Sequence, residues 1–193
     1  MPSGVGEDQA GTVRAGQELP VDALAAYLAE HLPGWSGPLS VAQFPQGYSN
    51  LTYLLRAGGQ EWVLRRPPFG VKIATAHDMQ REYRVLAGLS RVYAKVPRPL
   101  LYCADPDVIG APFYVMERLH GVVLRAGLAC EQAPPPAVMA GLSAAAVDNL
   151  AAIHALDVEA AELADLGKPA GYVTRQVQGW ISRYRAAQTD DLP

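Results

Sequence analysis

The stretch FPQGYSNLTYLLRAGGQEWVLRR, residues 44–66, carries the most structural information in this chain. Two apolar runs flank Gly58-Gly59, and adjacent glycines adopt positive φ without strain, so the stretch predicts two antiparallel strands around a tight turn. A small-residue loop at 46–50 leads into the first strand, and an arginine pair ends the second. Such a loop over a basic strand end is typical of a phosphate cover, and a plain hairpin is the alternative.

Composition narrows the class of protein. The chain has 193 residues, half of them apolar, and a net charge of −3. This balance supports a sizeable core and argues against a nucleic-acid binder, which usually presents a basic face. Cys103 and Cys130 lie far apart and predict a reducing compartment without a disulfide framework. We expect no run to span a bilayer and no signal peptide at the N-terminus, and therefore a cytoplasmic protein without membrane contact.

Hydrophobic spacing predicts the order helix, three strands, helix, two strands, linker and helices. Residues 1–18 are glycine-rich and polar, and we expect them to be flexible. The expected helices are residues 20–32, 75–89, 137–158 and 173–187. The expected strands are residues 39–44, 51–56, 61–66, 99–104 and 112–118. Together these elements predict an α+β protein with an antiparallel sheet.

Six stretches in this order resemble the aminoglycoside phosphotransferase and choline kinase superfamily. They are FPQGYSNLTYLL, WVLRRPP, MQREYRVLAGL, VPRPLLYCAD, APFYVMERLHG and LAAIHALD. The nearest likeness is to phosphotransferase domains related to those joined to acyl-CoA dehydrogenases. The resemblance implies a kinase-like fold: a small lobe of five antiparallel strands and one main helix, a hinge, and the first helices of an incomplete helical lobe.

The resemblance also implies a domain division and a function. Residues 1–18 would be a flexible N-terminus, 19–121 the small nucleotide-binding lobe with its hinge, and 122–193 a partial helical lobe. The family transfers the γ-phosphoryl group of ATP to a hydroxyl of a small-molecule substrate, with Mg²⁺ in the complete enzyme. The likeness to domains joined to acyl-CoA dehydrogenases suggests a hydroxyacyl-CoA as that substrate.

The loop before the second strand would cover the nucleotide phosphates. Gly47 allows close backbone approach, and Ser49 offers an N–H and a hydroxyl as donors. The loop lacks the three glycines of protein kinases, so fewer phosphate contacts are expected. The loop residues assigned to nucleotide binding are Gly47, Tyr48, Ser49 and Asn50.

Below that loop, the resemblance puts Arg65 in the place usually taken by lysine and Glu82 in the place of the helix acid. Arginine keeps its charge and adds bidentate geometry toward phosphate, so we expect a working substitute. Solvated surface charges are the alternative for this pair. Arg66 points the other way along the strand and is expected to be structural.

An adenine pocket is expected beside Arg65. Strand alternation puts Val63 on the same face as Arg65, where it would line the pocket. Met116 would stand at the back, and the carbonyl of Glu117 and the N–H of Leu119 would pair with the adenine edge. Ordinary core packing would bury Met116 equally well.

The sequence offers no catalytic or metal-binding residue in the family's pattern. The family's His-Gly-Asp-type loop supplies an aspartate that orients the substrate hydroxyl and an asparagine for magnesium. Between residue 137 and Pro193 no His-x-Asp is followed by Asn, and His154 is expected to be a packed histidine. We therefore expect a truncated chain that is inactive alone, with a homodimer or a partner covering the incomplete lobe. The alternative function is a non-catalytic nucleotide-binding or protein-interaction module.

Overall fold

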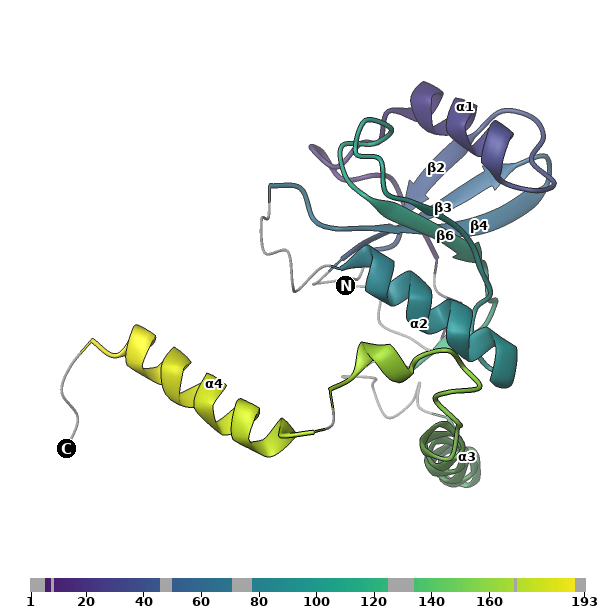
Figure 1. Ribbon diagram of the computed structural model, residues 1–193. Coiled ribbons are helices and arrows are strands. Elements are labelled where there is room, and N and C mark those ends of the chain that lie inside the picture. The colour runs from purple at the N-terminus through teal and green to yellow at the C-terminus, as the bar shows by residue number, and fades with distance from the viewer. Residues whose placement is uncertain are drawn as a thin grey trace.

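The computed structural model describes residues 6–7, 9–45, 50–70, 78–124, 134–168 and 170–189. Its centre is a five-stranded antiparallel sheet in the order β2-β3-β4-β6-β5 (Figure 1). The strands are β2 Ser40–Gln43, β3 Leu51–Ala57, β4 Gln60–Arg66, β5 Pro99–Cys103 and β6 Phe113–Glu117. The α+β class and all five expected strands are confirmed, each within one residue of its expected bounds.

The β3–β4 hairpin sets the two faces of this sheet. It closes because Gly58 and Gly59 adopt φ of 56° and 78°, the left-handed region that a two-residue hairpin turn requires. Its register places Leu54 opposite Val63 and Thr52 opposite Arg65. Because successive side chains alternate, these four residues share one face and their neighbours share the other.

Helix α1, Val21–His31, covers the face opposite the one that carries Val63 and Arg65 (Figure 1). Leu24 and Leu28 are fully buried there because they lie one turn apart on the same side of the helix. They join the main core together with Tyr53, Leu55, Leu64, Phe113 and Val115. The face that carries Val63 and Arg65 is therefore the one left for a site.

Helix α2, Met79–Val92, lies on the opposite side of the sheet from α1 and contacts β5 and β6 (Figure 1). The Asp78 side chain accepts a hydrogen bond from the Arg81 N–H at 2.9 Å and so caps the helix. The helix was expected over 75–89; residues 71–77 lie outside the described residues, and the observed helix runs on to Val92. Glu82 falls in its first turn, next to the sheet.

The segment before α1 differs from the flexible N-terminus that the composition predicts. Gly11 and Gln43 exchange backbone hydrogen bonds of 2.8 and 2.9 Å at the free edge of β2. Further toward the N-terminus, β1, Gly6–Glu7, pairs antiparallel with β7, Val122–Val123. Composition missed this attachment because backbone groups make these bonds whatever the side chains are.

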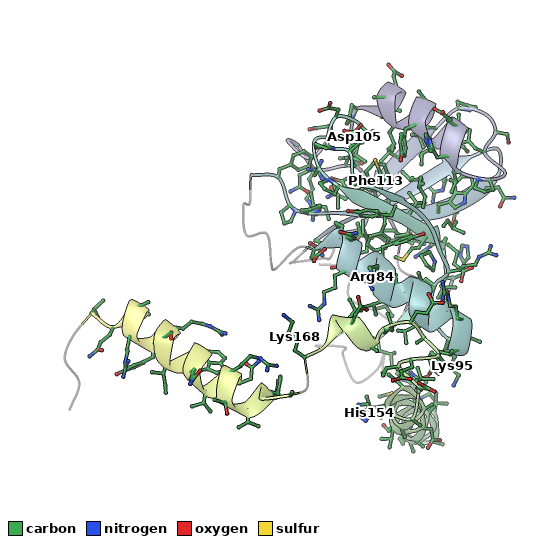
Figure 2. All side chains as sticks on the ribbon, viewed as in Figure 1. Arg84, Lys95, Asp105, Phe113, His154 and Lys168 are labelled. Carbon is green, nitrogen blue, oxygen red and sulfur yellow. The ribbon has the colours of Figure 1, made fainter. Side chains whose placement is uncertain are left out.

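Helices α3, Pro136–His154, and α4, Tyr172–Ala187, lie in the predicted regions, although α3 ends at His154 and not at residue 158, and neither helix buries a residue. Figure 1 shows α4 extending away from the sheet. His154, expected to be packed, is exposed at the end of α3 (Figure 2). The exposed large apolar side chains of the two helices include Val138, Leu142, Val147, Leu150, Val173, Val177, Trp180 and Tyr184.

Helix α3 also corrects the expectation about apolar runs. It has 19 residues and a mean hydropathy of 1.4, so by length and composition it could cross a membrane. The expectation that no run could span a bilayer is therefore wrong by length and composition, because the alanines of α3 combine with large apolar residues such as Leu142 and Ile153. A core helix of a soluble protein can have the same length and mean hydropathy.

The segment that follows α3 packs back onto α2. Gly88 of α2 meets Ala161, which is buried, and Leu163. Figure 2 shows Arg84 on α2, and its Nη2 donates to both Asp165 carboxylate oxygens at 2.9 Å. A second pair joins Arg91 to Glu162. The segment ends in a 3-10 turn at Ala164–Leu166.

Substituting Gly88→Ala should destabilise the fold. The new β-carbon would lie 2.7 Å from Leu163 Cδ2 and press on the Ala161 carbonyl oxygen, so helix and segment must separate. We expect the free energy of unfolding to fall by about 1–3 kcal/mol, measured by denaturant titration. Gly141→Ala in α3 is the control, because its β-carbon meets no atom within 4 Å among the described residues. A Gly88→Ala protein as stable as this control would contradict the packing.

Candidate functional site

An ion pair joins β4 to α2 on the face opposite α1. Arg65 Nη2 lies 3.4 Å from Glu82 Oε2, and each side chain is 32 % exposed. Arg65 reaches this place because it lies near the end of β4, where the first turn of α2 passes the sheet. The structure therefore brings together the two charged residues that the sequence analysis paired.

The Glu82 carboxylate is held from three directions. Asn50 Nδ2 donates to Oε1 at 2.6 Å, and the Tyr114 hydroxyl donates to Oε2 at 3.0 Å. Tyr114 lies directly opposite Arg65 in the β4–β6 register. Together with Arg65, these contacts hold the carboxylate between the start of β3, the β4–β6 ladder and α2. The fixed carboxylate in turn orients the Arg65 guanidinium.

Two of these contacts were not foreseen. Asn50 was assigned to nucleotide binding with its loop, whereas it is 3 % exposed and its amide is turned to Glu82. Tyr114 was not selected at all, although a tyrosine inside a buried strand needs a partner for its hydroxyl, and that signal was available. Burial raises the pKa of Tyr114 well above its usual range; the Glu82 carboxylate adds to this effect, and Arg65 opposes it. The hydroxyl therefore stays a donor near neutral pH.

Arg65 keeps unused hydrogen-bonding capacity. Its Nε is buried and has no hydrogen-bond partner in the part of the chain that the structure describes. A buried N–H without an acceptor is unfavourable. A guanidinium with a free N–H is suited to an anion such as phosphate.

A cavity of about 370 Å³ lies beside this ion pair. It is lined by Arg65, Asp78, Arg81, Glu82, Val85, Leu86 and Tyr114. Arg81 brings a second guanidinium, which the sequence analysis did not select; its Nη2 donates to the Leu166 carbonyl at a long 3.4 Å. The lining therefore carries two guanidinium groups, Arg65 and Arg81, and two carboxylates, Glu82 and the α2 cap Asp78.

The apolar part of the face lies next to Arg65. Val63 pairs with Met116 across β4 and β6, and Val63 forms a small buried cluster with Phe44 and Leu54, against which Met116 packs. Beyond it, the Glu117 N–H donates to the Arg98 carbonyl at 2.9 Å, and Leu119 is 53 % exposed. The geometry places Val63 and Met116 together beside Arg65, as expected, while the adenine contacts of Glu117 and Leu119 stay a prediction.

Other residues stand outside this constellation. Gly47, Tyr48 and Ser49 lie outside the described residues, so their phosphate contacts stay a prediction. Arg66 is 2 % exposed and turned to the other side, where its Nη1 donates to the Ile109 carbonyl at 2.9 Å. Within the described ranges, no three His, Cys, Asp or Glu side chains gather closely enough to hold a metal ion.

Known proteins resemble this chain over most of its length. The sequence model of the family described as "Phosphotransferase enzyme family" matches residues 40–193. Acyl-CoA dehydrogenase family member 11 from Homo sapiens is 36 % identical over 200 residues, covering 100 % of this chain and 25 % of that protein. Acyl-CoA dehydrogenase family member 10 from Mus musculus is 36 % identical over 197 residues, covering 100 % of this chain and 18 % of that protein.

A solved structure from Ralstonia eutropha JMP134, assigned to the aminoglycoside phosphotransferases, superposes with a TM-score of 0.71 at 34 % identity. The match covers 91 % of this chain and 50 % of that one. The chain thus spans a quarter or less of these two curated relatives and half of the solved chain. Because the family match includes the whole sheet, the Arg65–Glu82 pair and both later helices, the chain belongs to the phosphotransferase enzyme family and has its kinase-like fold.

Proposed function

We propose that this chain forms the nucleotide side of an ATP-dependent phosphotransferase that acts on the hydroxyl of a small metabolite. The observation that carries the proposal is the Arg65–Glu82 pair at 3.4 Å, which lines the cavity of about 370 Å³; among the described residues the buried Arg65 Nε has no acceptor. Membership of the phosphotransferase family supports the reaction class.

The geometry suits the demands of phosphoryl transfer, which depends on positioning and charge neutralisation more than on covalent help from the protein. Arg65 would contact the nucleotide phosphates, with its direction fixed through Glu82. Val63 and Met116 would hold the adenine on the apolar part of the same face. The loop residues Gly47, Tyr48 and Ser49 would cover the phosphates, while Asn50 would act by holding Glu82.

ATP is used with a divalent metal throughout this class of reaction, and we propose Mg²⁺ for the complete enzyme. The described residues of this chain do not fit a protein-held magnesium site. Both Glu82 oxygens already accept hydrogen bonds, and no group of three ligating side chains is present among these residues. We assign no residue of this chain to the metal.

The acceptor that we propose is a hydroxyacyl-CoA. Its support is that the relatives are acyl-CoA dehydrogenase family members. We also propose a cytoplasmic protein, a location in which free thiols such as the buried Cys103 persist.

Replacing Arg65→Ala should weaken binding of ATP about tenfold, the effect of losing a charge-assisted hydrogen bond. Adenosine affinity should change less than about twofold, because the base site lacks this contact. Isothermal titration with ATP and with adenosine, both with magnesium, measures the two effects. Arg185→Ala, which removes an exposed arginine from the last turn of α4, is the matched control and should change neither. Equal losses for ATP and adenosine would mean that Arg65 is structural.

The 193-residue chain alone should not turn over, because no residue matches the family's catalytic aspartate and asparagine. The assay incubates the purified chain with ATP, magnesium and a hydroxyacyl-CoA, and follows ADP and phosphorylated acceptor. Arg65→Ala serves as the control for contaminating kinases. Phosphorylation by the chain that disappears in Arg65→Ala would overturn this expectation.

A second candidate is a non-catalytic nucleotide-binding or interaction module, favoured by the exposed apolar side chains of α3 and α4. Trp180 is 64 % and Val173 72 % exposed, and surfaces of this kind tend to be buried by association. The partner would be a second copy or another protein.

If this surface drives association, light scattering after size exclusion should give a dimer or larger species. Trp180→Glu should shift it toward the monomer, because a charge then replaces the apolar contact. Gln178→Glu, at an exposed polar position of the same helix, should have no such effect. A clean monomer at high concentration would count against association through α4.

A further inference from the structure

The segment before α1 passes the face that carries Val63 and Arg65. It is joined to the free edge of the sheet at Gly11, which pairs with Gln43. It is joined to the far side at β1, which pairs with β7 just after the hinge. Between these two attachments, Ala10 packs against the cluster of Phe44, Leu54 and Val63. The segment therefore lies under the proposed adenine-binding part of the sheet.

Side chains along β4 show where this segment lies relative to the phosphate cavity. Glu61, Val63 and Arg65 share one face, and Arg65 lines the cavity at the α2 end. Glu61 lines a second cavity of about 220 Å³ at the opposite end, and Val63 lies between them. The second cavity is lined by Gln9, Ala10, Leu54, Arg56, Glu61, Arg118 and His120. A nucleotide with its phosphates at Arg65 and its base at Val63 would thus have residues 9–10 beyond the base.

The segment is held by a set of satisfied hydrogen bonds. Gln43 is 2 % exposed; its Oε1 accepts from the Arg14 N–H at 2.9 Å, and its Nε2 donates to Gln17 Oε1 at 2.7 Å. Arg14 Nη1 donates to the Pro45 carbonyl at 3.1 Å, at the start of the loop over the phosphates. The Tyr53 hydroxyl donates to the Gln17 carbonyl at 2.7 Å. Displacing the segment would leave the buried Gln43 amide without partners, which is strongly unfavourable.

We infer that residues 9–14 form a fixed wall of the base site and determine how tightly the base, rather than the triphosphate, is bound. This inference rests on the proposed nucleotide site. Its grounds are the packing of Ala10 beside Val63, the second cavity at the Glu61 end, and the buried anchor at Gln43. The wall acts as a positioning element and takes no part in the chemistry.

The test is Gly11→Pro, which removes the N–H that donates to the Gln43 carbonyl. Titration of the full chain with ATP, adenosine and inorganic tripolyphosphate, each with magnesium, separates the base from the phosphates. ATP and adenosine should lose affinity by the same factor, about fivefold, while tripolyphosphate stays unchanged. Gly11→Ala is the matched control: it keeps the N–H, its β-carbon meets no described atom within 4 Å, and all three affinities should stay as in the parent.

Three outcomes would overturn the wall. Tighter ATP binding by Gly11→Pro would mean that the segment blocks the site. Amide exchange shows whether the backbone bridge between residue 11 and Gln43 is lost. If it is lost and adenosine binding stays unchanged, the segment does not touch the base. If Gly11→Pro fails to fold by circular dichroism, Gln17→Ala replaces it, because the Gln17 side chain accepts from Gln43 Nε2 at 2.7 Å in the buried anchor; the same pattern is expected with a smaller loss. A parent chain that binds neither ATP nor tripolyphosphate defeats the proposed function itself. A parent that binds ATP while neither variant differs from it defeats only the wall.

Discussion

The Glu82 carboxylate is the point at which the start of β3, the β4–β6 ladder and α2 meet. Three residues from different parts of the chain contact it: Asn50 donates to Oε1, while Tyr114 and Arg65 contact Oε2. A carboxylate taken partly out of water is tolerated only when it is paired and hydrogen-bonded, and this one is both. The contacts that satisfy the Glu82 carboxylate hold α2 against the sheet, and the same carboxylate orients the Arg65 guanidinium. Stability and the proposed phosphate contact thus depend on one set of interactions.

Much of this arrangement follows from the sequence because its causes are local. Gly58-Gly59 dictates the hairpin, strand alternation puts Val63 and Arg65 on one face, and the helical spacing places Glu82 on α2. What the sequence left open depends on contacts between distant segments. Tyr114 becomes part of the site only through the register that sets it opposite Arg65. Arg81 joins the cavity only because α2 begins at Met79, beside β4 and β6.

The N-terminal segment shows a different limit of sequence interpretation. Its glycines and polar residues are typical of flexible termini, and no side-chain pattern indicates a strand. Its attachment depends on backbone groups at the edge of β2 and on a buried glutamine whose partners lie far along the chain. The family resemblance, and not composition, led us to expect uncovered apolar side chains on α3 and α4, and these side chains are exposed.

Gly88 allows the segment that follows α3 to pack closely on α2. The absence of a side chain there lets the segment at 161–163 lie directly on the helix, and Arg84 and Arg91 grip the same segment at Asp165 and Glu162. Glu82 stands on the same rigid helix, roughly 9 Å from Gly88 at the usual rise per residue. A displacement of that segment would therefore act on α2, and the other end of this helix carries the Glu82 carboxylate that contacts Arg65. Residues well outside the proposed nucleotide site would in this way affect the proposed contact of Arg65 with the phosphates.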